Sequence, residues 1–378
     1  MIIEQKKYDR SWISVSDNGL KDSASLVLAF GGTDLIKEGK IFGEITSLYP
    51  NAAVLLCSSA GEILGTAVSD NQLSLTAIKL EKTTLKFYEE NISKNTESLE
   101  RGKRLSAAID KSGLRHVMVF SDGLLVNGTT LVEGLTSQLP KNVSVTGGLV
   151  GDGARFRETL VGLNAQPAPG KIVVIAFYSQ ELKVGFGSLG GWDTFGPERE
   201  ITKAKDNVLY EIDGKPALAL YKQYLGEEAE GLPGSGLLFP LEISVATPSG
   251  DKQLVRTILN VDESSQSITF AGNMPVGSKA RLMKANFERL IDGAGGAASL
   301  TFKGEKSPPQ LAILISCIGR KLVLKERTEE ELEAVRDTLG KETVLTGFYS
   351  YGEISPVAAT ESQCQLHNQT MTITTFKE

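Results

Sequence analysis

The sequence predicts an α+β fold with mixed sheets, a layered sandwich built from repeated strand-helix-strand-strand units. The same order of buried-type strand, helix and second strand occurs three times along the chain. Each second strand ends in a tight turn whose glycine precedes a carboxylate, and a further strand with period-two alternation follows each turn. The 378 residues are 41% hydrophobic, so two or three packed units are expected.

The first copy begins with an apolar strand at 26–30, continues through a helical stretch and enters a second strand at 53–56. The turn after this strand reads Cys57-Ser58-Ser59-Ala60-Gly61-Glu62. Its further strand is predicted at 72–80. Glycine allows backbone conformations that a side chain forbids, so such a turn can be tight and can let a ligand approach the backbone.

The second and third copies repeat this order. The second has strands at 117–120 and 143–146, a helix at 129–138, a turn ending in Gly151-Asp152 and a further strand at 171–178. The third has strands at 311–316, 344–346 and 369–376, and its turn ends in Gly352-Glu353. Crossovers of this kind make parts of the sheets parallel and right-handed.

The helix of the third copy is expected to start near Thr328. Thr328 and Glu331 have the spacing of a capping box, in which hydroxyl and carboxylate satisfy free amides at a helix start. Leu332, Val335 and Leu339 then form an apolar stripe. This pattern predicts a packing helix without a chemical role.

A different segment separates the second and third copies. Residues 210–217 predict a strand and turn entering a helix at 218–225, and strands are expected at 238–245, 254–261 and 267–270. The Gly-rich stretch 293–298 is expected to separate this insertion from the third copy. A boundary near 193–207 divides the chain into domains 1–200 and 201–378.

Composition limits the classes of function. The formal net charge of -6 arises from interspersed charges without a basic stripe, which argues against nucleic acid as a partner. No apolar run approaches the ~20 residues that a bilayer requires, and the N-terminus lacks the apolar core of a secretory signal. Three widely spaced cysteines suit reduced thiols in a cytoplasmic protein.

Catalysis finds little support in the sequence. Cys57-Ser58-Ser59 follows a buried strand, but the flanking glycines of a nucleophile elbow are missing. Only His116 and His367 offer a general base, and His116 directly precedes a strand. The scattered histidines and cysteines form no recognisable metal site, and the glycines match no nucleotide-binding motif. A non-enzymatic protein without a resident cofactor is therefore expected.

Two groups of residues suggest a small-molecule pocket instead. Cys317 and Arg320 follow the end of a buried strand, where mixed sheets often bind ligands, and a guanidinium can hold a carboxylate through two hydrogen bonds. The region from Tyr349 to Asn368 combines aromatic faces, an anion and an amide. Its candidate residues are Tyr349, Tyr351, Gly352, Glu353, His367 and Asn368.

These motifs together resemble the FIST family, with an N-terminal and a C-terminal FIST region. The resemblance covers nearly the entire chain and rests on the first-copy turn through residue 63 and on residues 210–217, 316–320, 347–354 and 366–370. It implies a prokaryotic input module of signal transduction that binds small ligands such as amino acids. FIST regions are often fused to, or encoded beside, histidine kinases, chemoreceptors or cyclic-dinucleotide enzymes, and one branch resembles haem-bearing nitric oxide sensors.

We therefore expect a non-catalytic cytoplasmic sensor that recognises a small carboxylate or amino acid between its two FIST regions and signals through a separate protein. The expected ligand-binding residues are Cys57, Ser58, Ser59, Gly61, Glu62, Cys317, Arg320, Tyr349, Tyr351, Gly352, Glu353, His367 and Asn368.

Three alternatives remain open at this point. The first is a haem-binding nitric oxide sensor with His367 as the axial ligand. The second is an enzyme whose nucleophile is Cys57 or Cys317, which requires an accessible thiolate of low pKa. The third is a scaffold that binds proteins through an apolar surface around Trp192, Phe195 or residues 237–240.

Overall fold

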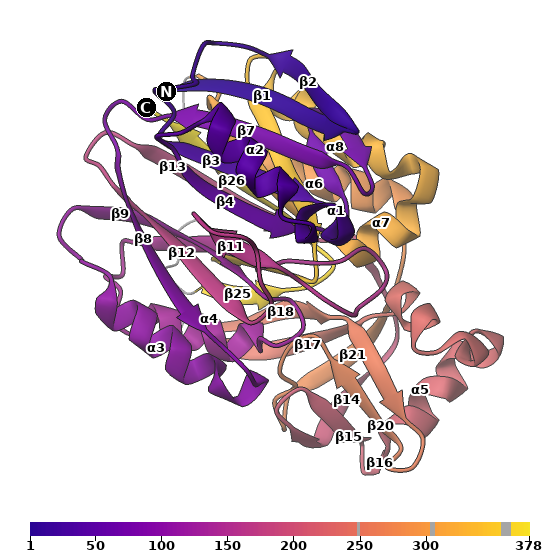
Figure 1. The fold of residues 1–378 in the computed structure, drawn as a ribbon. Coiled ribbons are helices and arrows are strands. Elements are labelled where there is room, and N and C mark those ends of the chain that lie inside the picture. The colour runs from indigo at the N-terminus through magenta and orange to yellow at the C-terminus, as the bar shows by residue number, and fades with distance from the viewer. Residues whose placement is uncertain (248–249, 303–306, 357–363) are drawn as a thin grey trace.

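The computed structural model describes residues 1–247, 250–302, 307–356 and 364–378. Three six-stranded sheets form the main body, and an eight-stranded sheet stands apart from it at the lower right of Figure 1. The two termini lie side by side, and the amino group of Met1 forms an ion pair with Glu378 at 3.4 Å. The predicted α+β class with mixed sheets is confirmed.

The first sheet has the strand order β11-β4-β3-β7-β1-β2. Its strands are β1 Ile2–Asp9, β2 Ser11–Ser16, β3 Leu26–Gly31, β4 Ala53–Ser58, β7 Leu73–Lys79 and β11 Val161–Leu163. The central strand β3 runs parallel to β4 and antiparallel to β7. Helices α1 (Thr33–Lys37) and α2 (Lys40–Leu48) connect β3 to β4, and α2 buries Ile41 and Ile45.

The second sheet repeats this arrangement with the order β25-β24-β10-β9-β12-β8. Its strands are β8 Thr84–Asn91, β9 Leu114–Ser121, β10 Ser144–Leu149, β12 Lys171–Tyr178, β24 Gly352–Pro356 and β25 Cys364–His367. The 3-10 turn η1 (Asn95–Glu97) and helices α3 (Ser98–Ala108) and α4 (Gly128–Thr136) accompany it. A Cβ on Gly134 would lie 2.2 Å from the carbonyl oxygen of Leu99, so α3 and α4 pack closely only because glycine stands there.

The third sheet has the order β13-β26-β22-β23-β5-β6. Its strands are β5 Glu62–Leu64, β6 Ala67–Ser69, β13 Lys183–Leu189, β22 Leu311–Cys317, β23 Val344–Ser350 and β26 Met371–Lys377. Its helical segments are α6 Phe287–Thr301, α7 Ile318–Leu324, η4 Lys325–Arg327 and α8 Thr328–Leu339. All three sheets therefore contain a central strand with one parallel and one antiparallel neighbour.

The three repeated units exchange strands in a cycle. Strand β5 leaves the first unit and pairs with β23 of the third. Strand β24 leaves the third unit and pairs with β10 of the second, and β11 leaves the second unit and pairs with β4 of the first. Each unit thus completes the sheet of another unit, so none of the three sheets is complete without its neighbour.

The centre between the sheets is filled by aromatic rings. The ring centroids of Phe30 and Phe348 lie 4.6 Å apart, and each lies 6.2 Å from that of Phe120. All three residues are fully buried. Gly148 stands opposite Phe120 in register, and a Cβ there would lie 2.8 Å from Ile315. This region is therefore a close-packed core.

The fourth sheet is formed by the insertion between the second and third units. Its strands are β14 Asp193–Lys205, β15 Val208–Ile212, β16 Lys215–Pro216, β17 Leu241–Thr247, β18 Gly250–Arg256, β19 Ile258–Asp262, β20 Ser267–Phe270 and β21 Lys279–Lys284. Helix α5 (Ala217–Leu225) and the 3-10 turns η2 (Gly226–Gly231) and η3 (Gly234–Leu238) complete it. The insertion has its own apolar core, and a boundary at residue 200 falls inside β14.

Two local predictions were wrong. The Gly-rich stretch 293–298 lies inside helix α6, where a Cβ on Gly293 would lie 2.2 Å from the carbonyl oxygen of Gly190. These glycines allow close packing and do not separate domains. Glu331 does not cap α8, because its carboxylate is fully buried and pairs with Arg320 at 2.7 Å.

Candidate functional site

The three turns that end in a glycine and a carboxylate meet in space. We call residues 58–62, 149–153 and 349–353 the turn cluster. Backbone hydrogen bonds connect them: the amide of Ala60 donates to the carbonyl of Tyr349, and the amide of Gly153 donates to that of Ser59. The amide of Tyr351 donates to the carbonyl of Leu149. The turns therefore form one hydrogen-bonded cluster where the units exchange strands.

The carboxylates of the first and third turns are enclosed in matching networks. Glu62 accepts a hydrogen bond from Ser59 at 2.6 Å, and Glu353 accepts one from Ser350 at 2.8 Å. Glu353 also accepts two from Thr370. Desolvation by burial raises the pKa of Glu62 to about 7 and that of Glu353 to about 8. Both groups are satisfied by neighbours in their own units.

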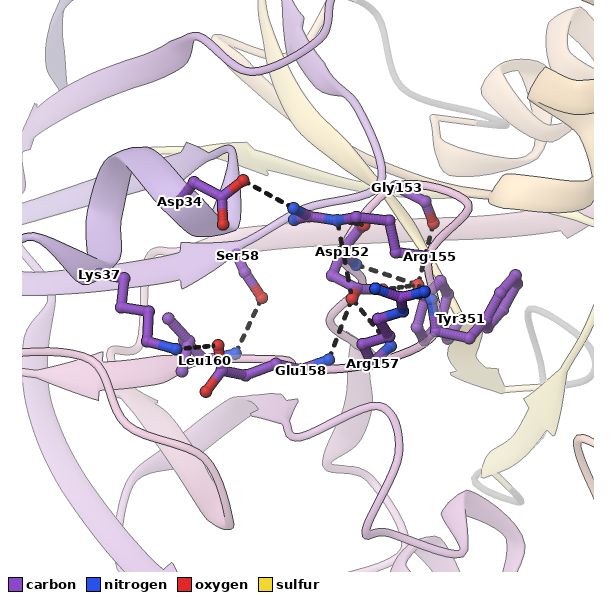
Figure 2. Close-up of polar contacts among 11 residues, drawn as sticks. Asp34, Lys37, Ser58, Asp152, Gly153, Arg155, Arg157, Glu158, Leu160 and Tyr351 are labelled. Carbon is purple, nitrogen blue, oxygen red and sulfur yellow. Dashed lines mark hydrogen bonds and ion pairs between the residues drawn. The ribbon is translucent and has the colours of Figure 1, made fainter.

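The carboxylate of the second turn shapes a loop instead, as Figure 2 shows. Asp152 accepts hydrogen bonds from the backbone amides of residues 156, 157 and 158 at 2.9 to 3.0 Å and from the hydroxyl of Tyr351. Arg155 pairs with Asp34 at 2.7 Å, and Lys37 pairs with Glu158 at 2.5 Å, so the loop is also attached to α1.

Phe156 is held in an uncommon conformation by this loop. Its φ is 53°, a left-handed value that bulky side chains rarely adopt. Its ring stacks on that of Tyr351 with centroids 4.5 Å apart, although the side chain is 38% exposed. Strained residues persist where surrounding contacts fix them, and they concentrate at functional sites. The hydrogen bonds to Asp152 supply those contacts.

The stacked rings line a cavity of about 170 Å³ between the second unit and the insertion. Its lining consists of Asn95, Gly123, Leu124, Val126, Asn127, Leu149, Phe156, Asn207, Leu259, Ala271 and Tyr351. Asn127 caps α4, since its side chain accepts from the amide of Thr130. The first turn of α4 therefore begins at the cavity wall, and helix N-termini favour anionic groups.

Among the predicted site residues, one group is placed away from this cavity. Arg320 is fully buried and donates to Glu331, to the carbonyl of Gly190 at 2.7 Å and to that of Leu290 at 2.7 Å. Tyr349 donates to the same glutamate at 2.6 Å. These internal bonds occupy the guanidinium, so its geometry does not fit the expected role as a clamp for a ligand carboxylate.

The three cysteines are buried and free. Desolvation raises the pKa of each thiol above its ordinary value. Cys57 and Cys317 thus lack the exposed thiolate of low pKa that the enzyme alternative requires. Ser58, beside Cys57, accepts a hydrogen bond from the amide of Leu160 at 2.9 Å and is likewise part of the internal structure.

The histidines do not fit haem ligation. Burial lowers the pKa of His367 to about 4 and that of His116 to about 3. The Nε2 atom of His367 lies 3.1 Å from the carbonyl oxygen of Ser355, and both ring nitrogens of His116 contact hydroxyl groups. A haem would have to displace the packed strands β24 and β25, so the surroundings of His367 do not fit the group.

Trp192, expected as part of an exposed protein-binding surface, is 6% exposed and donates to the carbonyl of Gln369 at 2.9 Å. Within the described ranges, no group of three or more histidine, cysteine or acidic side chains could hold a metal ion. The helices described are all too short or too polar to cross a membrane.

Sequence reasoning identified Tyr351 but missed most of the cavity. Phe156, Asn127 and Leu149 lie outside every predicted site group. The repeated Gly151-Asp152 turn in the sequence indicated the position of the loop that follows it. The left-handed backbone of Phe156 has no signature in the sequence. The insertion contributes Ala271, whose place at the wall depends on how the domains pack.

Comparison with known proteins shows the family to which this chain belongs. The FIST N domain of the family models matches residues 25–215, and the FIST C domain matches residues 217–356. The chain belongs to the FIST family. FIST domains are small-ligand-binding sensory domains of signal transduction. The cavity is lined by residues of both matched regions.

Two solved structures are similar at low identity. A chorismatase crystal structure is 7% identical with a TM-score of 0.34, over 99% of this chain and 98% of that chain. A cyanuric acid hydrolase from A. caulinodans is 10% identical with a TM-score of 0.18, over 78% and 100%. At these TM-scores neither comparison supports an inference about this chain. No curated protein matches it.

Proposed function

We propose that this protein is a non-catalytic sensor that binds a small amino acid or related carboxylate in the cavity between its two FIST domains. The observation that carries the proposal is the wall formed by Phe156 and Tyr351, which the loop around Asp152 holds in place at a cavity shared by both domains. Because these two side chains are already ordered in the free protein, the entropic cost of binding is lower.

The cavity suits a small ligand with an apolar part. Its volume of about 170 Å³ is below the roughly 300–1,000 Å³ of sites for drug-sized molecules. Leucine, valine and aromatic side chains form most of the wall, and asparagine side chains add hydrogen-bonding groups. The start of α4 offers a place for a negative charge.

The proposed output is a change in the contact between the insertion and the three-sheet body. A ligand that touches both Phe156 and Ala271 favours the arrangement in which the two parts close on it. We propose that a separate signalling protein, such as a histidine kinase or a cyclic-dinucleotide enzyme in the cytoplasm, reads this arrangement.

A thermal-shift screen with the twenty amino acids tests the proposal. A ligand present at 100 times its Kd stabilises the folded state by about 2.7 kcal/mol, which raises the unfolding midpoint measurably. Ala271→Trp fills the cavity and should abolish the shift, whereas Val276→Trp, at a 59% exposed position of the same insertion, should retain it. A shift that survives in Ala271→Trp, or no shift with any amino acid, would contradict the proposal.

A further inference from the structure

Arg256, at the end of β18, is a buried cation without an anion. It is 2% exposed, and its Nη1 and Nε atoms donate only to backbone carbonyls, those of Val255 and Leu366 among them, at 3.1 to 3.2 Å. Within the described part of the chain it has no ion pair. Arg320 is equally buried but is neutralised by Glu331. Buried charges are normally paired.

Asn368 is a second buried group without a partner. Its side chain is fully buried, and neither Oδ1 nor Nδ2 has a hydrogen-bond partner among the residues that the structure describes. Its Nδ2 lies 3.6 Å from the point that a Cβ on Gly352 would occupy, and Cδ1 of Leu149 lies 3.7 Å from the same point. Leu149 lines the cavity, so the amide of Asn368 lies near one residue of its wall, although Asn368 itself does not line the cavity.

Arg256 is connected to the same wall. Its Nε donates to the carbonyl of Asn273 at 3.2 Å. The side chain of Asn273 accepts from Asn127 at 2.9 Å, and its backbone amide donates to Thr129 at 3.3 Å. Asn127 and Thr129 belong to the cap and first turn of the nine-residue helix α4. Cδ1 of Leu149, which lies near Asn368, is also 3.1 Å from the point that a Cβ on Gly128, the first residue of α4, would occupy. Arg256 and Asn368 are therefore both connected through single residues to the start of α4.

We propose that Arg256, Asn368 and the first turn of α4 form a subsite for the charged end of an α-amino acid whose side chain packs on Phe156. The Nδ2 atom of Asn368 would donate to the ligand carboxylate and its Oδ1 atom would accept from the ligand ammonium group. This inference rests on the proposed function and specifies which residues recognise the ligand.

The electrostatics agree with this role. Desolvation by burial lowers the pKa of Arg256 to about 10. No described carboxylate offsets this cost by pairing with the guanidinium. A carboxylate in the subsite would supply a counterion. The free amide of Asn368 likewise has a donor and an acceptor that remain unused until a ligand is present.

Acetate, the simplest carboxylate, tests the subsite without knowledge of the ligand. The unfolding midpoint is measured while sodium acetate replaces sodium chloride at constant ionic strength, with acetamide as the neutral probe. Acetate should raise the midpoint of the wild-type protein, and acetamide should not. The rise should disappear in Arg256→Met and remain in Arg199→Met, a control in the same insertion whose guanidinium pairs with Asp213.

Asn368→Leu is the second variant, because it removes no hydrogen bond of the folded protein and should weaken the acetate effect even if Arg256→Met does not fold. No acetate effect on the wild type, or an effect that persists in Asn368→Leu, would overturn the subsite. Amino-acid binding that Ala271→Trp abolishes and Arg256→Met leaves unchanged would refute the subsite alone. An acetate effect without binding of any amino acid would retain Arg256 and Asn368 as a carboxylate site and refute the amino acid as its ligand.

Discussion

Replacing Asn368 by leucine is predicted to stabilise the protein while it weakens ligand binding. Leucine has the branched shape of asparagine but a larger volume, so the substitution removes two buried polar atoms without opening a cavity, and the extra volume adds packing strain. An unsatisfied buried polar group costs about 1–3 kcal/mol, and no hydrogen bond of the folded protein is lost. Because the packing strain of the larger leucine offsets part of this gain, we expect the free energy of unfolding to rise by about 1 kcal/mol.

Urea denaturation of the wild type and Asn368→Leu measures this change as a shift of the midpoint at unchanged slope. Asn286→Leu is the matched control, because Asn286 caps α6 and donates to Asp193 at 2.8 Å. The loss of these contacts should destabilise the protein by about 1 kcal/mol. A midpoint for Asn368→Leu as low as that of Asn286→Leu would refute the reasoning, since it would mean that the substitution breaks hydrogen bonds that the amide makes in solution.

Three further predictions concern the buried groups. Glu331→Gln should destabilise the protein by about 3–5 kcal/mol, measured by urea denaturation, because it leaves the charge of Arg320 buried and unpaired. The control Glu330→Gln, in an exposed ion pair, should change stability by at most about 1 kcal/mol. The free energy of unfolding should fall between about pH 6.5 and pH 8, and Glu353→Gln should reduce that slope. The three thiols should react with a mild alkylating agent at the rate of unfolding, and fast labelling of any one in the folded protein would contradict its burial.

The sign of the pH dependence follows from two opposing sets of groups. The pKa values of Glu62 and Glu353 rise from 4.5 to about 7 and about 8, so the folded state retains protons that the unfolded state has released. Stability is then lost as the pH rises through the folded values. The lowered pKa values of the two histidines act in the opposite direction, but only below their ordinary value of 6.5. The decrease above that pH therefore belongs to the glutamates.

The repeated units were predictable because each carries its own pattern of apolar strand, helix and glycine turn. The cyclic exchange of strands was not, since β5 and β11 are three residues long and too short for a periodic signal. The glycines of α6 were taken for a domain boundary because glycine has a low helix propensity. Their role in close packing depends on the segment at Gly190, which the local sequence does not show.

The candidate site was predicted in part. Tyr351 lines the cavity, and Gly352 and Asn368 lie near Leu149 of its wall, whereas Arg320 belongs to an internal ion pair. The sequence does not distinguish a paired arginine from an unpaired one. The structure shows that Arg320 has a buried carboxylate partner, whereas Arg256 has none among the described residues. The partner of a buried charge is set by tertiary packing, which local patterns do not contain.

A crystal structure of the protein with the amino acid that gives the largest thermal shift tests the central claim most directly. We predict density for the ligand between Phe156 and Ala271, with its carboxylate on Arg256. An unchanged, empty cavity with the amino acid bound at another place would contradict the account.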